Sequence, residues 1–254
     1  MIKNKYTIIW IRIWQSGLTN LKIKLSKFVL LLKPLLLMII HNFENEHSIL
    51  NQYIVELRDS SIQQDAMRFR RNIERIGEIL SYELSKTLTY HNVNVNSPLG
   101  KKEVSVLNDP VVICSILRAG LPLHHGILNY FDKAENAFIS AYRKHIKNGD
   151  DFNVIVNYLA SPSLDNKTLI LSDPMLATGK TLENTLKAME SHGNPKQLHV
   201  IAVIGSVQGV AYTEKILPEH AHLWIAAIDS KLNSRGYIIP GLGDAGDLSY
   251  GEKL

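Results

Sequence analysis

The stretch TLILSDPMLATGKTLENTL, residues 168–186, decides the fold because it combines an apolar run, a short loop and a helix-like segment. The apolar run ends at Asp173, and Gly179-Lys180-Thr181 opens the helix-like segment. A strand followed by a loop and a helix makes an anion site, because the free amides at a helix N-terminus and the helix dipole favour a phosphate group. The stretch therefore predicts an α/β unit that binds a phosphate.

The Gly-Lys-Thr sequence also raises the alternative of a nucleotide-binding P-loop, and with it a P-loop kinase. A P-loop has a glycine five residues before the glycine of Gly-Lys-Thr, but that position holds Pro174. Proline fixes φ and has no N–H to donate to a phosphate, whereas glycine permits the torsions that let a backbone wrap one. The sequence therefore favours a different kind of phosphate loop.

Apolar runs and helix-like segments alternate along most of the chain. Predicted strands occupy residues 111–117, 137–142, 168–173, 198–205 and 223–229, and predicted helices occupy residues 119–131, 178–192 and 206–217. Apolar runs without alternation indicate strands buried on both faces, so the pattern predicts a parallel sheet flanked by helices. A longer helix is expected from residue 60, where Ser61 and Gln64 have the spacing of a capping box.

Charge and cysteine content bound the class of protein. The formal net charge is +4, but residues 1–37 contain seven basic residues and no acidic one. The other 217 residues therefore hold 21 basic and 24 acidic residues, a net charge of −3. This mildly acidic body does not support a nucleic-acid partner. The single cysteine, Cys114, lies in an apolar run where we expect it to be buried, and it fits a reducing, cytoplasmic location.

The first 37 residues differ in kind from the rest. Their apolar run extends to residue 40, is 13 residues long and is interrupted by Lys33 and Pro34, whereas a membrane-spanning helix needs about 20 residues. We therefore expect no membrane span. Signal and transit peptides match only in part, and a targeting segment stays the alternative. Our prediction is that residues 1–37 are not part of the fold, that Met38 is the functional start, and that residues 38–254 form the domain.

Four segments supply candidate site residues. Amides and hydroxyls of residues 177–181 can hold a phosphate monoester, and Asp173 suits sugar hydroxyls, so together they indicate a ribose 5-phosphate. Arg118, at the end of a strand and before two small residues, suits a diphosphate. A basic loop that begins at Arg143 could close over an anionic substrate. The glycine-rich segment 236–251 indicates a loop that presents its backbone to a flat ligand.

These motifs, SDPMLATGKT, ILRAGL, YR and GYIIPGLGDAGD, resemble those of the uracil phosphoribosyltransferases in identity and order, over about residues 41–254. The resemblance implies the type I phosphoribosyltransferase fold, with a small hood formed partly by the C-terminal loop. It implies transfer of a phosphoribosyl group from phosphoribosyl diphosphate to N1 of uracil, giving UMP and diphosphate, as in pyrimidine salvage. It further implies Mg²⁺ held mainly by substrate oxygens and water, no metal site of protein side chains, and a homo-oligomer, either a dimer or a tetramer.

The resemblance also assigns roles to residues. Arg118, Arg143, Asp173 and Asp244 are the expected catalytic residues, and the two arginines would contact the diphosphate. The expected contacts of the 5-phosphate and ribose are Asp173, Pro174, Met175, Leu176, Ala177, Thr178, Gly179, Lys180 and Thr181. Asp244 would lie beside the ribosyl diphosphate. The expected contacts of uracil are Ile238, Gly243, Asp244 and Ala245, through the main chain. Asp229 is a candidate for a supporting role.

One alternative function shares the fold. Some pyrimidine-operon regulators keep a phosphoribosyltransferase fold and bind RNA. The acidic body and the uracil-type C-terminal loop argue against it here, and steeply salt-dependent RNA binding would favour it. Lys180 departs from the small residue that is often found at its position, which leaves its role in the phosphate loop open.

Overall fold

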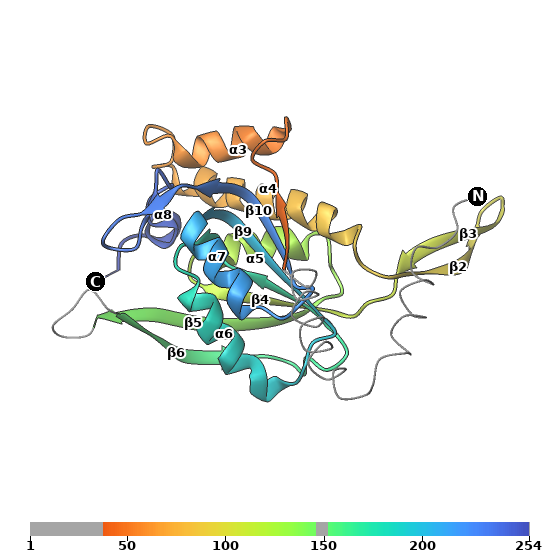
Figure 1. Ribbon diagram of the computed structural model, residues 1–254. Helices are drawn as coiled ribbons and strands as arrows, with labels where there is room; N and C mark the ends of the chain where they lie inside the picture. Colours follow the sequence, from red (N-terminus) through yellow and green to blue (C-terminus); the bar gives the residue numbers. More distant parts are fainter. Residues whose placement is uncertain (1–37, 146–151, 254) are drawn as a thin grey trace, which may run out of the picture. The chain divides into compact units, whose positions relative to one another are not determined.

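The computed structural model describes residues 38–145 and 152–253 (Figure 1). The predictions for residues 1–37 lie outside the described residues, as do those for the basic loop at 146–151. Within the described part of the chain, no helix combines the length and apolar character that crossing a membrane requires.

A mixed, mostly parallel sheet forms the centre of the fold (Figure 1). Its strands are β1 (Ile39–Asn42), β4 (Val111–Leu117), β5 (Glu135–His145), β6 (Phe152–Ala160), β7 (Thr168–Ser172), β8 (Met175–Leu176), β9 (Gln197–Ser206) and β10 (His222–Asp229). The spatial order is β1-β10-β9-β7-β4-β5-β6, with β8 beside β9, and only β6 is antiparallel to its neighbour. The predicted parallel sheet is thus confirmed, and β1 and β6 add an unpredicted strand at each edge.

The central strands are apolar because both faces of the sheet are covered. Ile113 of β4 belongs to one hydrophobic cluster, whereas its neighbours Val112 and Cys114 belong to another. This alternation follows from the period of two along a strand. Cys114 is buried, as predicted, and burial raises the pKa of its thiol to about 12.

Helices occupy both faces. They are α3 (Ile49–Arg58), α4 (Ala66–Ser85), α5 (Gly120–Leu128), α6 (Lys180–Met189), α7 (Val207–Ile216) and α8 (Ala245–Tyr250). Residues of α3, α4 and α5 contribute to the cluster that contains Ile113, and residues of α6 and α7 contribute to the cluster that contains Cys114. The prediction of flanking helices is therefore confirmed.

The predicted start of the long helix was wrong. Helix α4 begins at Ala66, and the Asp65 side chain caps it by accepting a hydrogen bond from the Arg68 amide at 3.0 Å. The Ser61 hydroxyl instead donates to the Asp59 carboxylate at 2.6 Å, in a turn between α3 and α4. Aspartate is a strong N-cap residue, so the cap four residues further on determines where the helix begins.

Two hairpins complete the described chain. Strands β2 (Tyr90–Ser97) and β3 (Gly100–Leu107) pair antiparallel, as do β11 (Lys231–Leu232) and β12 (Ile238–Ile239). The second hairpin leads into α8, which is held to α4 by a hydrogen bond of 2.6 Å from Arg70 Nη1 to the Ser249 carbonyl. These last elements form the predicted hood beside the carboxyl ends of the strands.

Candidate functional site

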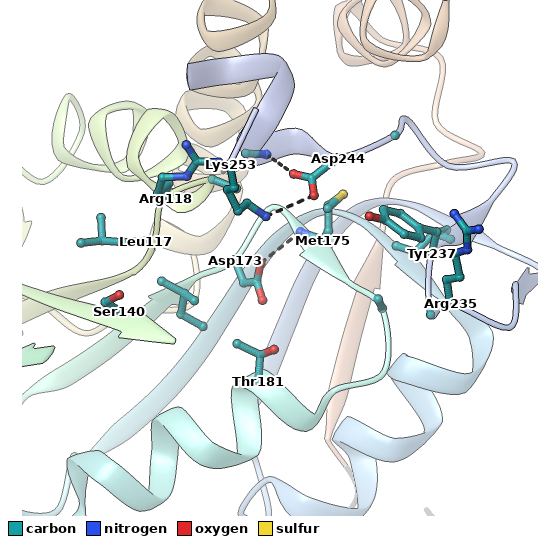
Figure 2. Close-up of a pocket in the computed structure, with 17 residues that line it drawn as sticks. Leu117, Arg118, Ser140, Asp173, Met175, Thr181, Arg235, Tyr237, Asp244 and Lys253 are labelled. Carbon is teal, nitrogen blue, oxygen red and sulfur yellow. Dashed lines mark hydrogen bonds and ion pairs between the residues drawn. The ribbon is translucent and has the colours of Figure 1, made fainter. Parts of the chain in front are cut away.

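A cavity of about 890 Å³ lies at the carboxyl ends of β4 and β7, under the C-terminal segment (Figure 2). In open α/β sheets this edge is where ligands bind. Its lining residues are Ile116, Leu117, Arg118, Ala119, Ser140, Asp173, Met175, Ala177, Thr181, Arg235, Gly236, Tyr237, Ile238, Gly243, Asp244, Gly246 and Lys253. Three cations and two carboxylates are thus among the described residues that face the same space.

The loop between β7 and α6, residues 173–179, forms one wall. Asp173 follows β7, and its Oδ1 accepts a hydrogen bond from the Met175 amide at 3.2 Å. Gly179 is the N-cap of α6 with φ of +77°, a left-handed conformation that glycine adopts at little cost. Ala177 and Thr181 line the cavity. The start of α6 therefore borders the cavity and contributes Thr181 to its lining.

Helix α7 supports this loop from behind. The Ser206 hydroxyl donates to the Ala177 carbonyl at 2.6 Å and accepts from the Gly209 amide at 2.8 Å. A Cβ at Gly209 would lie 2.2 Å from the Ala177 carbonyl oxygen. Only glycine lets α7 approach the loop this closely. The contact between Gly209 and Ala177 therefore fixes the position of the loop relative to α7.

Arg118 forms the opposite wall and is linked to α8. Its Nη2 lies 2.8 Å from Asp247 Oδ1, and its Nη1 donates to the Gly251 carbonyl at 3.2 Å. Lys253 Nζ lies 3.4 Å from Asp244 Oδ2, a pair drawn in Figure 2. Asp244 also caps α8 by accepting from the Asp247 amide at 3.0 Å. Arg118 is therefore oriented by the residues that follow the C-terminal loop. This loop comprises residues 236–245, and its Asp244 pairs with Lys253.

The C-terminal loop turns sharply at two glycines. Gly241 and Gly243 have φ of +65° and +86°. Ile238 and Gly243 line the cavity. The loop is tied to the sheet by the buried Asp229, which accepts a hydrogen bond from the Gly241 amide at 3.2 Å. The cavity is thus bordered by the loop after β7, by Arg118 and by the C-terminal loop.

Known proteins resemble this chain in sequence. A model of the uracil phosphoribosyltransferase family matches residues 44–251. The chain belongs to the uracil phosphoribosyltransferase family. It is 54% identical over 209 residues to a uracil phosphoribosyltransferase of Porphyromonas gingivalis, covering 82% of this chain and 96% of that one. It is 35% identical over 218 residues to one of Thermococcus gammatolerans, covering 85% and 94%.

A solved structure agrees with the fold. The structure of a protein from Aquifex aeolicus superimposes with a TM-score of 0.74 at 30% sequence identity. The match covers 84% of this chain and all of that one. Membership of the family and the observed sheet flanked by helices together confirm the fold that the sequence predicted.

The structure brings many of the predicted site residues of this uracil phosphoribosyltransferase family member into one cavity. They are Arg118, Asp173, Met175, Ala177, Thr181, Ile238, Gly243 and Asp244. Residues Pro174, Leu176, Thr178, Gly179, Lys180 and Ala245 do not line it. Leu176 and Ala245 have side chains buried in the two hydrophobic clusters, which leaves only their main chains for a ligand. Arg143 lies on β5, and its side chain is outside the described part.

Several lining residues were not found from the sequence. Lys253 and Tyr237 line the cavity, as does Arg235 (Figure 2). Ser140 contributes from within β5. Tyr237 lies inside the quoted motif GYIIPGLGDAGD but was not singled out. Lys253 lies outside every quoted motif and reaches the site only after α8 folds back towards Arg118. The Gly-rich segment 236–251 was the one available signal, since it marked where the chain returns to the sheet.

Proposed function

We propose that this chain transfers the 5-phosphoribosyl group from phosphoribosyl diphosphate to N1 of uracil, giving UMP and diphosphate. The observation that carries the proposal is the single cavity that Arg118, the loop after β7 and the C-terminal loop enclose in a member of this family. A ligand with a phosphate at one end, a diphosphate at the other and a planar base fits such a set of walls.

Each wall then has a role. The amides and hydroxyls at the start of α6 hold the 5-phosphate, since a helix N-terminus favours an anion. Asp173 accepts hydrogen bonds from ribose hydroxyls, and Arg118, with Arg143, binds the diphosphate. The main chain of the C-terminal loop, at residues 238–245, matches the two carbonyls and the N3–H of uracil. Asp244 lies beside the ribosyl diphosphate.

The reaction breaks the bond between C1′ and the diphosphate oxygen and forms the bond between C1′ and N1 of uracil, which loses its proton. The electron pair of the broken bond leaves with the diphosphate. Positive charge therefore develops on the ribosyl ring in the transition state, and negative charge develops on the leaving group. Positioning of the two substrates and stabilisation of these charges are what the residues contribute.

The carboxylates of the cavity fit a Mg²⁺ ion that arrives with the substrate. No three His, Cys, Asp or Glu side chains of the described residues are grouped to hold a metal, and Asp173 and Asp244 are the two carboxylates on the cavity wall. Mg²⁺ keeps several waters and binds one or two carboxylates together with substrate phosphates. When bound, it would neutralise charge on the departing diphosphate. A cytoplasmic location and a homo-oligomeric state stay predictions from the sequence.

The proposal is tested by measuring diphosphate release from phosphoribosyl diphosphate with each of uracil, cytosine, adenine, hypoxanthine and orotate. Uracil should be the base that is turned over, with UMP as the product. Equal turnover of adenine or orotate would contradict the assignment. Absence of release with every base, together with salt-sensitive RNA binding, would instead favour the regulator.

A further inference from the structure

We infer that Arg58 and Asp229 act together as a positioning pair that holds the C-terminal loop in its uracil-binding shape. The inference rests on the proposed function, and it assigns a role in base affinity to two residues that do not line the cavity. Arg58 is the last residue of α3 and Asp229 is the last residue of β10, 171 positions apart in the sequence.

The pair is bidentate and well shielded from water. Arg58 Nη1 lies 2.9 Å from Asp229 Oδ2, and Nη2 lies 3.0 Å from Oδ1. The Asp229 side chain is 6% exposed and that of Arg58 is 23% exposed. Two parallel hydrogen bonds between a guanidinium and a carboxylate fix both groups in one plane, so the pair forms a rigid unit.

This unit holds both backbone groups of Gly241. Arg58 Nη1 donates to the Gly241 carbonyl at 3.0 Å, and Asp229 Oδ2 accepts from the Gly241 amide at 3.2 Å. Gln63 adds a hydrogen bond of 2.8 Å to the Leu57 carbonyl and a longer one of 3.4 Å to the Leu242 carbonyl. The end of α3 and the turn after it therefore hold consecutive residues of the loop.

Fixing Gly241 also fixes the residue that faces the base. Gly241 has φ of +65°, and a Cβ there would lie 2.2 Å from the Ile238 carbonyl oxygen. The turn from Ile238 to Gly241 is thus tight enough for a shift at one end to move the other. Ile238 lines the cavity and is one of the residues expected to present its main chain to uracil. A loosened pair should consequently weaken uracil binding and spare the phosphoribosyl diphosphate walls.

Two substitutions test this role. Arg58→Lys keeps the charge and most of the volume, but an ammonium group cannot make the planar two-point contact and hold the Gly241 carbonyl as well. Asp229→Asn keeps an acceptor for the Gly241 amide and removes the charge that compensates Arg58. Loss of one charge-assisted hydrogen bond corresponds to about a tenfold change in an equilibrium constant. We expect KM for uracil to rise by about that factor, while KM for phosphoribosyl diphosphate changes by less than about twofold.

The matched control is Lys86→Met, because it breaks a lysine–glutamate pair of 2.6 Å with Glu83 that is exposed and does not line the cavity. It should leave both KM values unchanged. Hydrogen–deuterium exchange provides the second readout: amides of residues 238–243 should exchange faster in Arg58→Lys than in the natural chain, and equally in Lys86→Met.

The outcomes separate this inference from the proposed function. If the natural chain makes UMP but Arg58→Lys raises both KM values equally, or lowers kcat alone, the pair has only a structural role and the inference is wrong. Unchanged exchange in residues 238–243 would also contradict it. If the natural chain makes no UMP, the proposed function itself fails, and the exchange measurement still shows whether the pair holds the loop.

Discussion

A single residue, Pro174, distinguishes the loop after β7 from a P-loop. Its carbonyl accepts hydrogen bonds from the Val203 and Ile204 amides at 3.1 and 3.0 Å, so the loop is fixed to β9 where a P-loop would have a glycine. Lys180 begins α6 and does not line the cavity. The residue that is central to a P-loop therefore lies outside the cavity lining here, whereas Asp173 is part of that lining.

We accordingly expect Asp173→Asn to lower kcat by about a hundredfold, because a misplaced ribose loses that much of the positioning effect. Lys180→Ala should lower it by less than about threefold, since Lys180 is only half-buried and does not line the cavity. Steady-state UMP formation measures both. Near-complete loss of activity in Lys180→Ala, together with ATP hydrolysis by the natural chain, would instead favour the P-loop hypothesis.

Lys253 gives the second prediction at this scale. Its ammonium group lies 3.4 Å from Asp244 and its side chain is 60% exposed. Such an exposed pair is weak, so a diphosphate can compete for the lysine. Lys253→Ala should raise KM for phosphoribosyl diphosphate by about fivefold, the equivalent of one modest ionic contact, and Lys253→Arg should restore most of it.

The control for Lys253 is Lys101→Ala, an exposed lysine of β3 that does not line the cavity. It should leave KM for phosphoribosyl diphosphate unchanged. A Lys253→Ala variant with the natural KM at low ionic strength would show that this lysine does not bind substrate.

At the scale of elements, two glycines each allow a helix to pack closely against a neighbour. The neighbour is the phosphate loop for Gly209 and helix α4 for Gly126. A Cβ at Gly209 of α7 would lie 2.2 Å from the Ala177 carbonyl oxygen of the phosphate loop. A Cβ at Gly126 of α5 would lie 2.0 Å from the Glu74 carbonyl oxygen of α4, away from the cavity lining. Both alanine variants should lower thermal stability, because overpacking costs about 1–3 kcal/mol.

Only Gly209→Ala should also alter substrate binding. Displacement of Ala177 moves the start of α6, so KM for phosphoribosyl diphosphate should rise about tenfold or more, as misplacement of a binding group does. Calorimetry and steady-state kinetics of both variants provide the comparison. Equal KM values in the two variants would mean that α7 does not set the position of the loop.

A histidine cluster joins three neighbouring strands. His41 Nε2 lies 3.0 Å from His222 Nδ1, and Trp224 Nε1 donates to His199 Nδ1 at 3.1 Å. Burial lowers the pKa of all three histidines from the ordinary 6.5, and for His199 burial, aided by His222 and His41, lowers it to about 3. Asp109 acts on His199 in the opposite direction.

These pKa values predict how stability depends on pH. The pKa values of these histidines are lower in the folded chain than in the unfolded chain, so the unfolded chain binds more protons as pH falls. The contribution of the histidines to the free energy of unfolding is therefore fully present above pH 6.5 and is lost as pH falls towards about 3. Each histidine changes the free energy of unfolding by at most about 1.4 kcal/mol per pH unit. Urea unfolding at pH 7 and pH 5 should show a smaller loss for His199→Leu than for the natural chain, and an unchanged loss for the exposed His47→Gln.

At the scale of the whole molecule, the sequence predicted the central strands because they are apolar on both faces. It did not predict β1, whose four residues include His41 and Asn42 and pair with residues of β10 that lie 183 positions away (for example 222 − 39 = 183). The site motifs were visible because glycine, proline and arginine stand at strand ends. Arg58 and Lys253 were not, because only the tertiary fold brings them to the loop and the cavity. The independence of the fold from residues 1–37 stays a prediction.

A crystal structure of the protein with UMP bound tests the central claim most directly, because it places the base and the phosphate at once. We predict the 5-phosphate against the amides of residues 177–181, the ribose hydroxyls at Asp173, and the uracil ring against the main chain of residues 238–245. A uracil ring outside the C-terminal loop, or a phosphate held at Arg118 instead of the start of α6, would contradict this account.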